Sequence, residues 1–248
     1  MMESAEANYN TVCRTGSNRS GGIAVLMALI FMFTAVGAVA EYQDEFSDTV
    51  TINSAMLPYN VPKSNILILT DGNLYTSGTG INVGDAHYVK IDGQGDTLFF
   101  GSSGADDVYG IKLSWSPEYI QIKNMTIIHN VPDNSPAEDC GPIHIFGDDS
   151  VLVENVNMVA RGVAGNCIDA TIDGGNGISN LWVKDCRCSN KSHSFSNRDG
   201  DPAAAFRVCA DGKTHSAEEY TGKFENVVVT ETPHSAIYTT GGIKRPKL

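Results

Sequence analysis

The sequence predicts an all-β protein in which short strand units stack as a solenoid. One template recurs along the chain: apolar, charged, Asn or Asp, apolar, polar or small, apolar. Its four copies are residues 122–127, 153–158, 183–188 and 224–229. Their Asn or Asp residues lie 31, 30 and 41 residues apart, a spacing typical of stacked repeat proteins. Because each copy alternates with the period of a strand and no long helical period separates the copies, each repeat is predicted to be a β unit.

The Asn or Asp of each copy is predicted to lie at a bend between two short strands, where its side chain can bond its own backbone. Side chains at equivalent places in successive copies should then lie over one another and build one continuous core. The sequence therefore predicts an internal, structural ladder of Asn124, Asn155, Asp185 and Asn226. A looser fifth copy, residues 88–93, ends at Gly93, which is 31 residues before Asn124.

The first forty residues carry a predicted export signal. An uncharged apolar run, residues 21–40, follows Arg14 and Arg19 and closes with the small residues Ala38, Val39 and Ala40. This pattern predicts that residues 1–40 are a signal peptide or an amino-terminal membrane anchor. Both alternatives place everything from Glu41 onward outside the cytoplasm, secreted or at the cell surface.

Two further segments follow the leader. Residues 41–64 contain Pro58 and Pro62 and are predicted to be an entry segment that caps the first repeat. Residues 65–248 are predicted to form the stacked repeats. Since no closing cap is evident before Leu248, we expect either a longer natural polypeptide or another subunit at this end.

Composition narrows the class of partner and the state of the cysteines. The net charge of -12 argues against nucleic acid, because no basic face exists to neutralise phosphates. Five cysteines follow the leader, and since five is odd at least one thiol should stay free or pair between chains. Cys186 and Cys188 fall at apolar places of the template and are predicted to be buried core thiols.

A second strand in each repeat predicts a polar column on the outer wall. Residues 111–113, 143–145, 168–170, 206–208 and 237–239 share an apolar, variable, apolar or small pattern. Alternation places the middle residue of each on the solvent side. The column consists of Lys112, His144, Asp169, Arg207 and Tyr238. These groups suit a sugar chain, although outward strand positions are often polar without any binding role.

An insertion after the third template copy adds further candidates. Residues 189–202 are polar and bounded by Gly and Pro, as in loops that line a binding face, but a loop without function is an equal alternative. We expect the loop to approach Asp169 and Arg207. The catalytic candidates are Asp169, Arg207, His144 and His193. The substrate-binding candidates are Lys112, Tyr238, Arg198, Asp199 and Asp201.

A third register holds the candidate metal ligands Asp148, Asp173 and Asp211. Carboxylates stacked one strand apart would repel each other unless a cation such as Ca²⁺ bound between them. Ordinary Asp-Gly turn chemistry is the alternative. Asn190, in Asn190-Lys191-Ser192, is predicted to be a surface glycosylation site.

A family resemblance accompanies this pattern. The series 80–83, 89–95, 110–113 and 120–127 resembles the opening coils of the single-stranded right-handed parallel β-helix of the pectate-lyase-like superfamily. It is similar to the carbohydrate-binding and sugar-hydrolase repeats of bacterial and archaeal surface proteins, over about residues 65–242. In the polygalacturonase-like hydrolases of this superfamily, an Asn-Thr-Asp, an Asp-Asp, a Gly-His-Gly and an Arg-Ile-Lys follow one another. Of these motifs, Asp148-Asp149 is the one that this chain matches.

The resemblance implies an exported or cell-surface protein. Its expected function is to bind an extracellular polysaccharide, with cleavage by a lyase or glycoside hydrolase mechanism as an extension. A non-catalytic structural or adhesive surface protein is the alternative, because the fold alone does not select a function.

Overall fold

The regular structure of this protein is almost entirely β-strand. The computed structural model describes residues 46–102, 104–114, 118–146, 150–172, 180–196, 200, 202–210 and 221–240. They belong to a compact unit, Tyr42–Leu248. Within these residues the one helical element is the short 3-10 helix η1 (Ser54–Met56). Thus the all-β prediction is confirmed. None of the described residues forms a helix that could cross a bilayer, and the predicted leader, 1–40, lies outside them.

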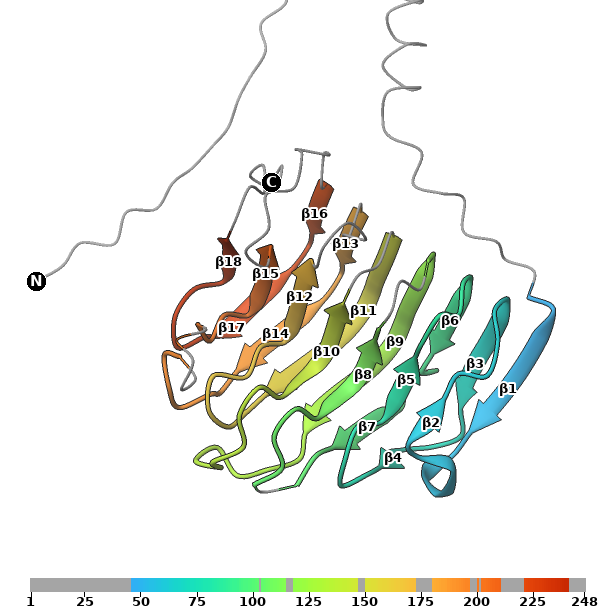
Figure 1. Cartoon of the computed structure of the whole chain (residues 1–248), viewed down its shortest axis with the longest axis horizontal. Helices are drawn as coiled ribbons and strands as arrows, with labels where there is room; N and C mark the ends of the chain where they lie inside the picture. The colour runs from blue at the N-terminus through green and yellow to red at the C-terminus, as the bar shows by residue number, and fades with distance from the viewer. Residues whose placement is uncertain are drawn as a thin grey trace, which may run out of the picture. The chain divides into compact units, whose positions relative to one another are not determined.

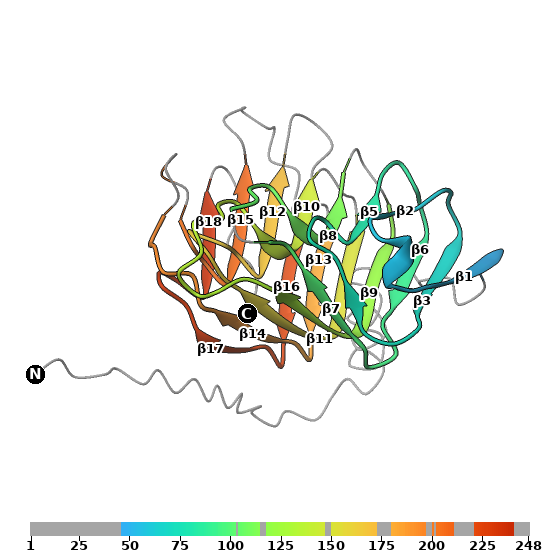
Figure 2. The same ribbon diagram turned by 90° about the horizontal axis from the view of Figure 1, so that it is seen from below.

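The strands form two sheets in which every neighbour is parallel (Figures 1 and 2). The main path of the first sheet consists of β1 (Asp48–Ile52), β3 (Ile66–Thr70), β6 (Val89–Asp92), β9 (Ile120–His129), β11 (Ser150–Ala160), β13 (Asn180–Lys184) and β16 (Thr221–Glu225). Its branch consists of β4 (Leu74–Tyr75), β7 (Thr97–Phe100), β14 (Arg187–Asn190) and β17 (Val228–Glu231), which pair with one another or with the second halves of β9 and β11.

The second sheet consists of β2 (Tyr59–Asn60), β5 (Ile81–Val83), β8 (Tyr109–Leu113), β10 (Gly141–Phe146), β12 (Ile168–Ile172), β15 (Phe206–Ala210) and β18 (Ile237–Thr240). Strand order follows chain order in both sheets, so that neighbouring strands come from successive repeats (Figure 1). This arrangement is consistent with a parallel β-solenoid. The segment predicted as a cap, 41–64, contributes the edge strands β1 and β2 instead of only covering the first repeat.

The Asn and Asp residues of the template lie at the predicted bends. Asn124, Asn155, Asp185 and Asn226 have φ angles of 55°, 55°, 52° and 52°. This left-handed conformation crowds most side chains against the backbone, whereas Asn and Asp tolerate it, which explains why the template requires them. Directly after the fifth copy, 88–93, the positive φ angles fall instead on Gln94 and Gly95.

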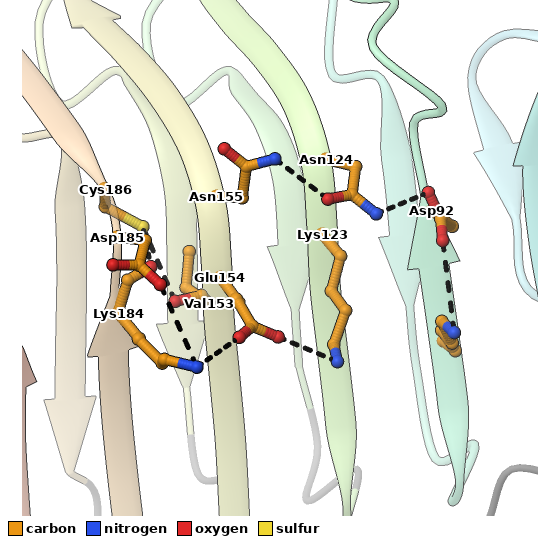
Figure 3. A network of polar contacts seen from close by, with 10 residues as sticks. Asp92, Lys123, Asn124, Val153, Glu154, Asn155, Lys184, Asp185 and Cys186 are labelled. Atoms are coloured by element: carbon orange, nitrogen blue, oxygen red, sulfur yellow. Dashed lines mark hydrogen bonds and ion pairs between the residues drawn. The ribbon is translucent and has the colours of Figure 1, made fainter.

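The bend residues form a ladder, but on the surface and not inside the protein. The carboxamide of Asn155 donates to Oδ1 of Asn124 at 2.9 Å, and Asn124 donates to Oδ1 of Asp92 at 3.1 Å (Figure 3). Asn226 donates to Oδ1 of Asp185 at 3.0 Å. Asn155, Asp185 and Asn226 are exposed. The prediction of an internal ladder was therefore wrong. At each bend the Asn or Asp side chain points to the surface, whereas the strands on both sides of the bend direct their apolar residues into the core.

A ladder of alternating charges runs beside it. Five residues in register carry charges of alternating sign: Asp92, Lys123, Glu154, Lys184 and Glu225. Glu154 accepts from Lys184 at 2.8 Å and contacts Lys123 at 2.9 Å (Figure 3). Hydrogen bonds first from Lys184 and then from Lys123 lower the pKa of the Glu154 carboxyl. Opposite charges lie directly across neighbouring strands and stabilise this pairing. A pairing shifted by one repeat would place like charges opposite each other.

The core is built from columns of aliphatic residues, as the template predicts. Ile68, Ile91, Ile122, Val153 and Val183 are in register and fully buried. A disulfide joins Cys167, just before β12, to Cys188 in β14. Cys188 is buried as predicted, but the prediction that it is a thiol was wrong. Cys186 is a buried free thiol as predicted. Cys140, for which no such prediction was made, is a buried free thiol as well.

Candidate functional site

The predicted polar column is present on the second sheet. Backbone pairing places Lys112 beside His144, His144 beside Asp169, Asp169 beside Arg207, and Arg207 beside Tyr238. Flanking residues such as Ile143 and Ile145 are fully buried in the core, so the column faces away from it. The predicted alignment is thus confirmed, whereas the catalytic and binding roles assigned to these residues stay predictions.

Two asparagines extend the column toward the amino terminus. Asn82 pairs with Lys112, and Asn60 pairs with Asn82. The carboxamide of Asn82 donates to Oδ1 of Asn60 at 3.0 Å. The sequence signal for Asn82 was available, because Ile81-Asn82-Val83 has the same apolar, variable, apolar pattern as the other strands. The two-residue strand around Asn60 is too short to show such alternation.

Asp169 and Arg207 form an ion pair in the middle of this column. Nη1 of Arg207 donates to Oδ2 of Asp169 at 3.0 Å. Both side chains are largely covered, with 13% of Arg207 and 11% of Asp169 exposed. A hydrogen-bonded pair in such a place fixes both charges, so a ligand would approach groups that are already oriented.

His144 is held in its neutral form beside this pair. Burial, followed by the positive charges of Lys112 and Arg207, lowers the pKa of the imidazole to about 4. Its ring contacts the ring of Tyr109 edge to face, with centroids 4.3 Å apart. Nδ1 of His144 is buried and forms no hydrogen bond with any described residue. The imidazole therefore adds no charge to the column near neutral pH.

Tyr109 is a residue of this site that the sequence interpretation missed. The ammonium of Lys112 lies 5.5 Å from the centre of its ring. Burial is the main cause that raises the pKa of the Tyr109 hydroxyl, and the charge of Asp169 adds to it, so the hydroxyl stays protonated. A Cβ on Gly110 would lie 2.4 Å from the Cγ2 atom of Ile127, so glycine is needed for the chain to pass close to the core here. The Tyr-Gly pair that opens β8 was the available signal.

The described contacts of His193 are with Asp133 and Gly162, and not with the residues of the column. Its Nδ1 lies 3.0 Å from the carbonyl oxygen of Asp133, and its backbone N–H donates to the carbonyl of Gly162 at 3.0 Å. Arg161 also binds Asp133, with Nε donating to Oδ1 at 2.8 Å. The insertion therefore packs on its neighbouring loops through His193. The predicted residues Arg198, Asp199 and Asp201 lie outside the described residues.

The base of the insertion is fixed by Asn190, which corrects the predicted glycosylation site. Asn190 is 2% exposed, and its carboxamide donates to the carbonyls of Gly165 at 2.7 Å and Ala204 at 2.8 Å. Its Oδ1 accepts from the backbone N–H of Ser192 at 3.0 Å. Because all of its polar groups are engaged inside the protein, this asparagine is inaccessible to glycosylation in the folded state.

The metal prediction falls outside the described residues. None of the three candidate ligands, Asp148, Asp173 and Asp211, belongs to the described residues, so the predicted Ca²⁺ site stays a prediction. Across the part of the chain that is described, no three His, Cys, Asp or Glu side chains are grouped closely enough to hold a metal ion.

Comparison with known proteins identifies no relative of this chain. No protein-family model, curated protein or solved structure matches this chain. The likeness to the pectate-lyase-like superfamily therefore rests on the repeat pattern, and any function must be argued from the column itself.

Proposed function

We propose that this chain is an exported right-handed parallel β-helix that binds an extracellular polysaccharide along the polar column of the second sheet. The observation that carries the proposal is the register of seven outward residues on consecutive strands. They are Asn60, Asn82, Lys112, His144, Asp169, Arg207 and Tyr238. Adjacent strands lie about 4.8 Å apart. A linear ligand with a regularly spaced set of hydroxyl or acidic groups can contact several of these strands at once.

Alternation of strand residues alone does not account for this column. On the branch of the first sheet, the outward residues Phe99, Ile128 and Val159 are also in register, and they are apolar. Outward positions of this protein are therefore not polar by default. The main path of the first sheet also carries an outward polar row, but there Lys123 and Lys184 both pair with Glu154. In the column of the second sheet, Lys112 forms no ion pair with any described residue, which supports a binding role over the alternative of a purely structural wall.

The groups of the column match the functional groups of a sugar chain. The carboxamides of Asn60 and Asn82 donate and accept hydrogen bonds, as sugar hydroxyls do. Lys112 offers a charge for an acidic substituent, and the Tyr238 ring at the far end offers an apolar face for a sugar ring. Binding is proposed without a cleavage step. Glycoside hydrolysis uses two carboxyl groups, and Asp169 is the sole acid among the described column residues.

A glycan array probed with the full chain, with and without Ca²⁺, tests this proposal. We expect binding to a linear polysaccharide that Lys112→Ala and Tyr238→Ala each weaken. Lys90→Ala, which removes an equivalent charge from β6 of the first sheet, is the matched control and should bind normally. Absence of binding to every glycan, or equal losses in all three variants, would support the structural or adhesive alternative. Release of shortened chains would add a cleavage step.

A further inference from the structure

Two tyrosine rings lie in contact where the chain enters neighbouring strands of the first sheet. Tyr88 directly precedes β6, and Tyr119 directly precedes β9. These strands pair so that Val89 lies opposite Ile120. The backbone N–H of Tyr88 donates to the carbonyl oxygen of Glu118 at 2.9 Å, so the parallel pairing extends to the tyrosines. The ring centroids are 4.8 Å apart, and the ring planes differ by 8°. Among the described residues this is the one contact between two tyrosine rings.

Both tyrosines have a backbone conformation that is unfavourable for a bulky side chain. The φ angles of Tyr88 and Tyr119 are 55° and 58°, in the left-handed region. The residue at the same place of the preceding repeat is Asn65, with a φ angle of 59°. Asparagine tolerates this angle better than tyrosine does. Backbone strain of this kind persists where the surrounding structure supports it, and it is concentrated at functional positions. The two rings are thus held where the backbone alone favours asparagine or glycine.

We propose that Tyr88 and Tyr119 are a site of oxidative cross-linking, at which a one-electron oxidant joins the two rings as dityrosine. Tyr88 is 40% exposed and Tyr119 is half-buried, so an oxidant can reach both rings from solvent. Reacting groups that are held in contact react as one molecule, which favours coupling within a chain over coupling between chains. The bond joins residues 31 positions apart, in consecutive repeats. This proposal is independent of polysaccharide binding.

The reaction uses an oxidant that takes up electrons in single steps, such as a peroxidase supplied with hydrogen peroxide. Each phenol hydroxyl loses one proton and one electron, which gives two phenoxyl radicals with unpaired electron density at the Cε atoms. One Cε atom of each ring then forms the new carbon–carbon bond. The hydrogens on the two bonded carbons leave as protons, and two protons return to the oxygens, which restores both phenols. In total the protein loses two hydrogen atoms, and one molecule of hydrogen peroxide takes them up to form two molecules of water.

Limited oxidation of the full chain tests the proposal. The chain is kept at micromolar concentration in a detergent that covers the apolar segment 21–40, treated with a peroxidase and hydrogen peroxide, then unfolded and digested with trypsin. Because trypsin cuts after Lys and Arg, Tyr88 falls on peptide 64–90 and Tyr119 on peptide 113–123. Mass spectrometry should find these two peptides joined, with a mass two hydrogen atoms below their sum. The oxidised chain should still migrate as a monomer on a denaturing gel.

Three conservative variants show which rings react. Tyr88→Phe and Tyr119→Phe keep an aromatic ring at each place but remove one phenol, so each should abolish the joined peptides. Tyr75→Phe is the matched control. Tyr75 lies on the same tryptic peptide as Tyr88 and is 55% exposed, but its ring stacks on Phe99 and not on a tyrosine. The joined peptides should form in this variant as in the unchanged chain.

Circular dichroism establishes that each variant is folded. Absence of the joined peptides from the oxidised, unchanged chain would overturn the proposal. So would their persistence in Tyr88→Phe or Tyr119→Phe, their loss in Tyr75→Phe, or coupling that occurs only between chains.

Discussion

The ladder of bend residues gives a direct test of why the template requires Asn or Asp. Asn155 has φ 55° and donates one hydrogen bond of 2.9 Å to Asn124. An alanine at this φ costs about 1 kcal/mol of backbone strain, and the lost hydrogen bond costs about 1 kcal/mol more. Asn155→Ala should therefore lower the free energy of unfolding by about 2 kcal/mol. Asn155→Gly, which removes the bond but tolerates the angle, should cost about 1 kcal/mol.

Urea unfolding followed by circular dichroism measures both changes. The matched control is Asn157→Ala, two residues further along the same strand, where the side chain is exposed and φ is not positive. It should change the free energy of unfolding by less than about 0.5 kcal/mol. A loss for Asn155→Ala as small as that of Asn157→Ala would contradict the role of Asn155 at the bend. If Asn155→Gly destabilises the protein as much as Asn155→Ala, backbone strain is not the reason for the Asn.

Three further predictions follow from the core and the column. Cys188→Ser opens a disulfide that closes a loop of 21 residues and should cost about 3 kcal/mol in urea unfolding, with no such gap under reducing conditions. The pKa values of His144 and His129 are both lowered from 6.5 to about 4, so the unfolded chain takes up protons first as the pH falls. The free energy of unfolding should be highest above pH 6.5 and should fall toward pH 4 by about 1.4 kcal/mol per pH unit for each imidazole. His144→Gln should halve the slope of this fall. An unchanged slope would contradict the burial of His144. Arg207→Leu leaves a buried carboxylate and should cost about 3 kcal/mol, whereas adding Asp169→Leu should recover part of the loss; a double variant less stable than Arg207→Leu would refute this.

The repeat and its register were predictable because they depend on local patterns. Asn124, Asn155 and Asp185 occur at near-constant spacing, and only a few residue types adopt their backbone angle. The outward column followed from strand alternation in the same way. Both features are properties of each repeat by itself, so they can be read without knowledge of the neighbouring repeats.

The errors concern contacts between repeats. Asn190 matches a glycosylation pattern, but its partners Gly165 and Ala204 come from two other loops, which no local motif encodes. The pairing of Cys188 with Cys167 likewise depends on how the turn before β12 approaches β14. Tyr109 lies beside Gly110, where the backbone passes close to Ile127 of the next strand, β9. Such relations require the three-dimensional arrangement of successive repeats.

The central claim is that residues one repeat apart lie directly over one another, and a single distance tests it. Tyr75 and Glu231 are both exposed and are connected through five consecutive register pairs on the branch of the first sheet. Spin labels on Tyr75→Cys and Glu231→Cys should give a narrow distribution of distances near 24 Å by double electron–electron resonance, since each strand adds about 4.8 Å. A broad distribution, or a centre more than about 10 Å from this value, would contradict the stacking of repeats.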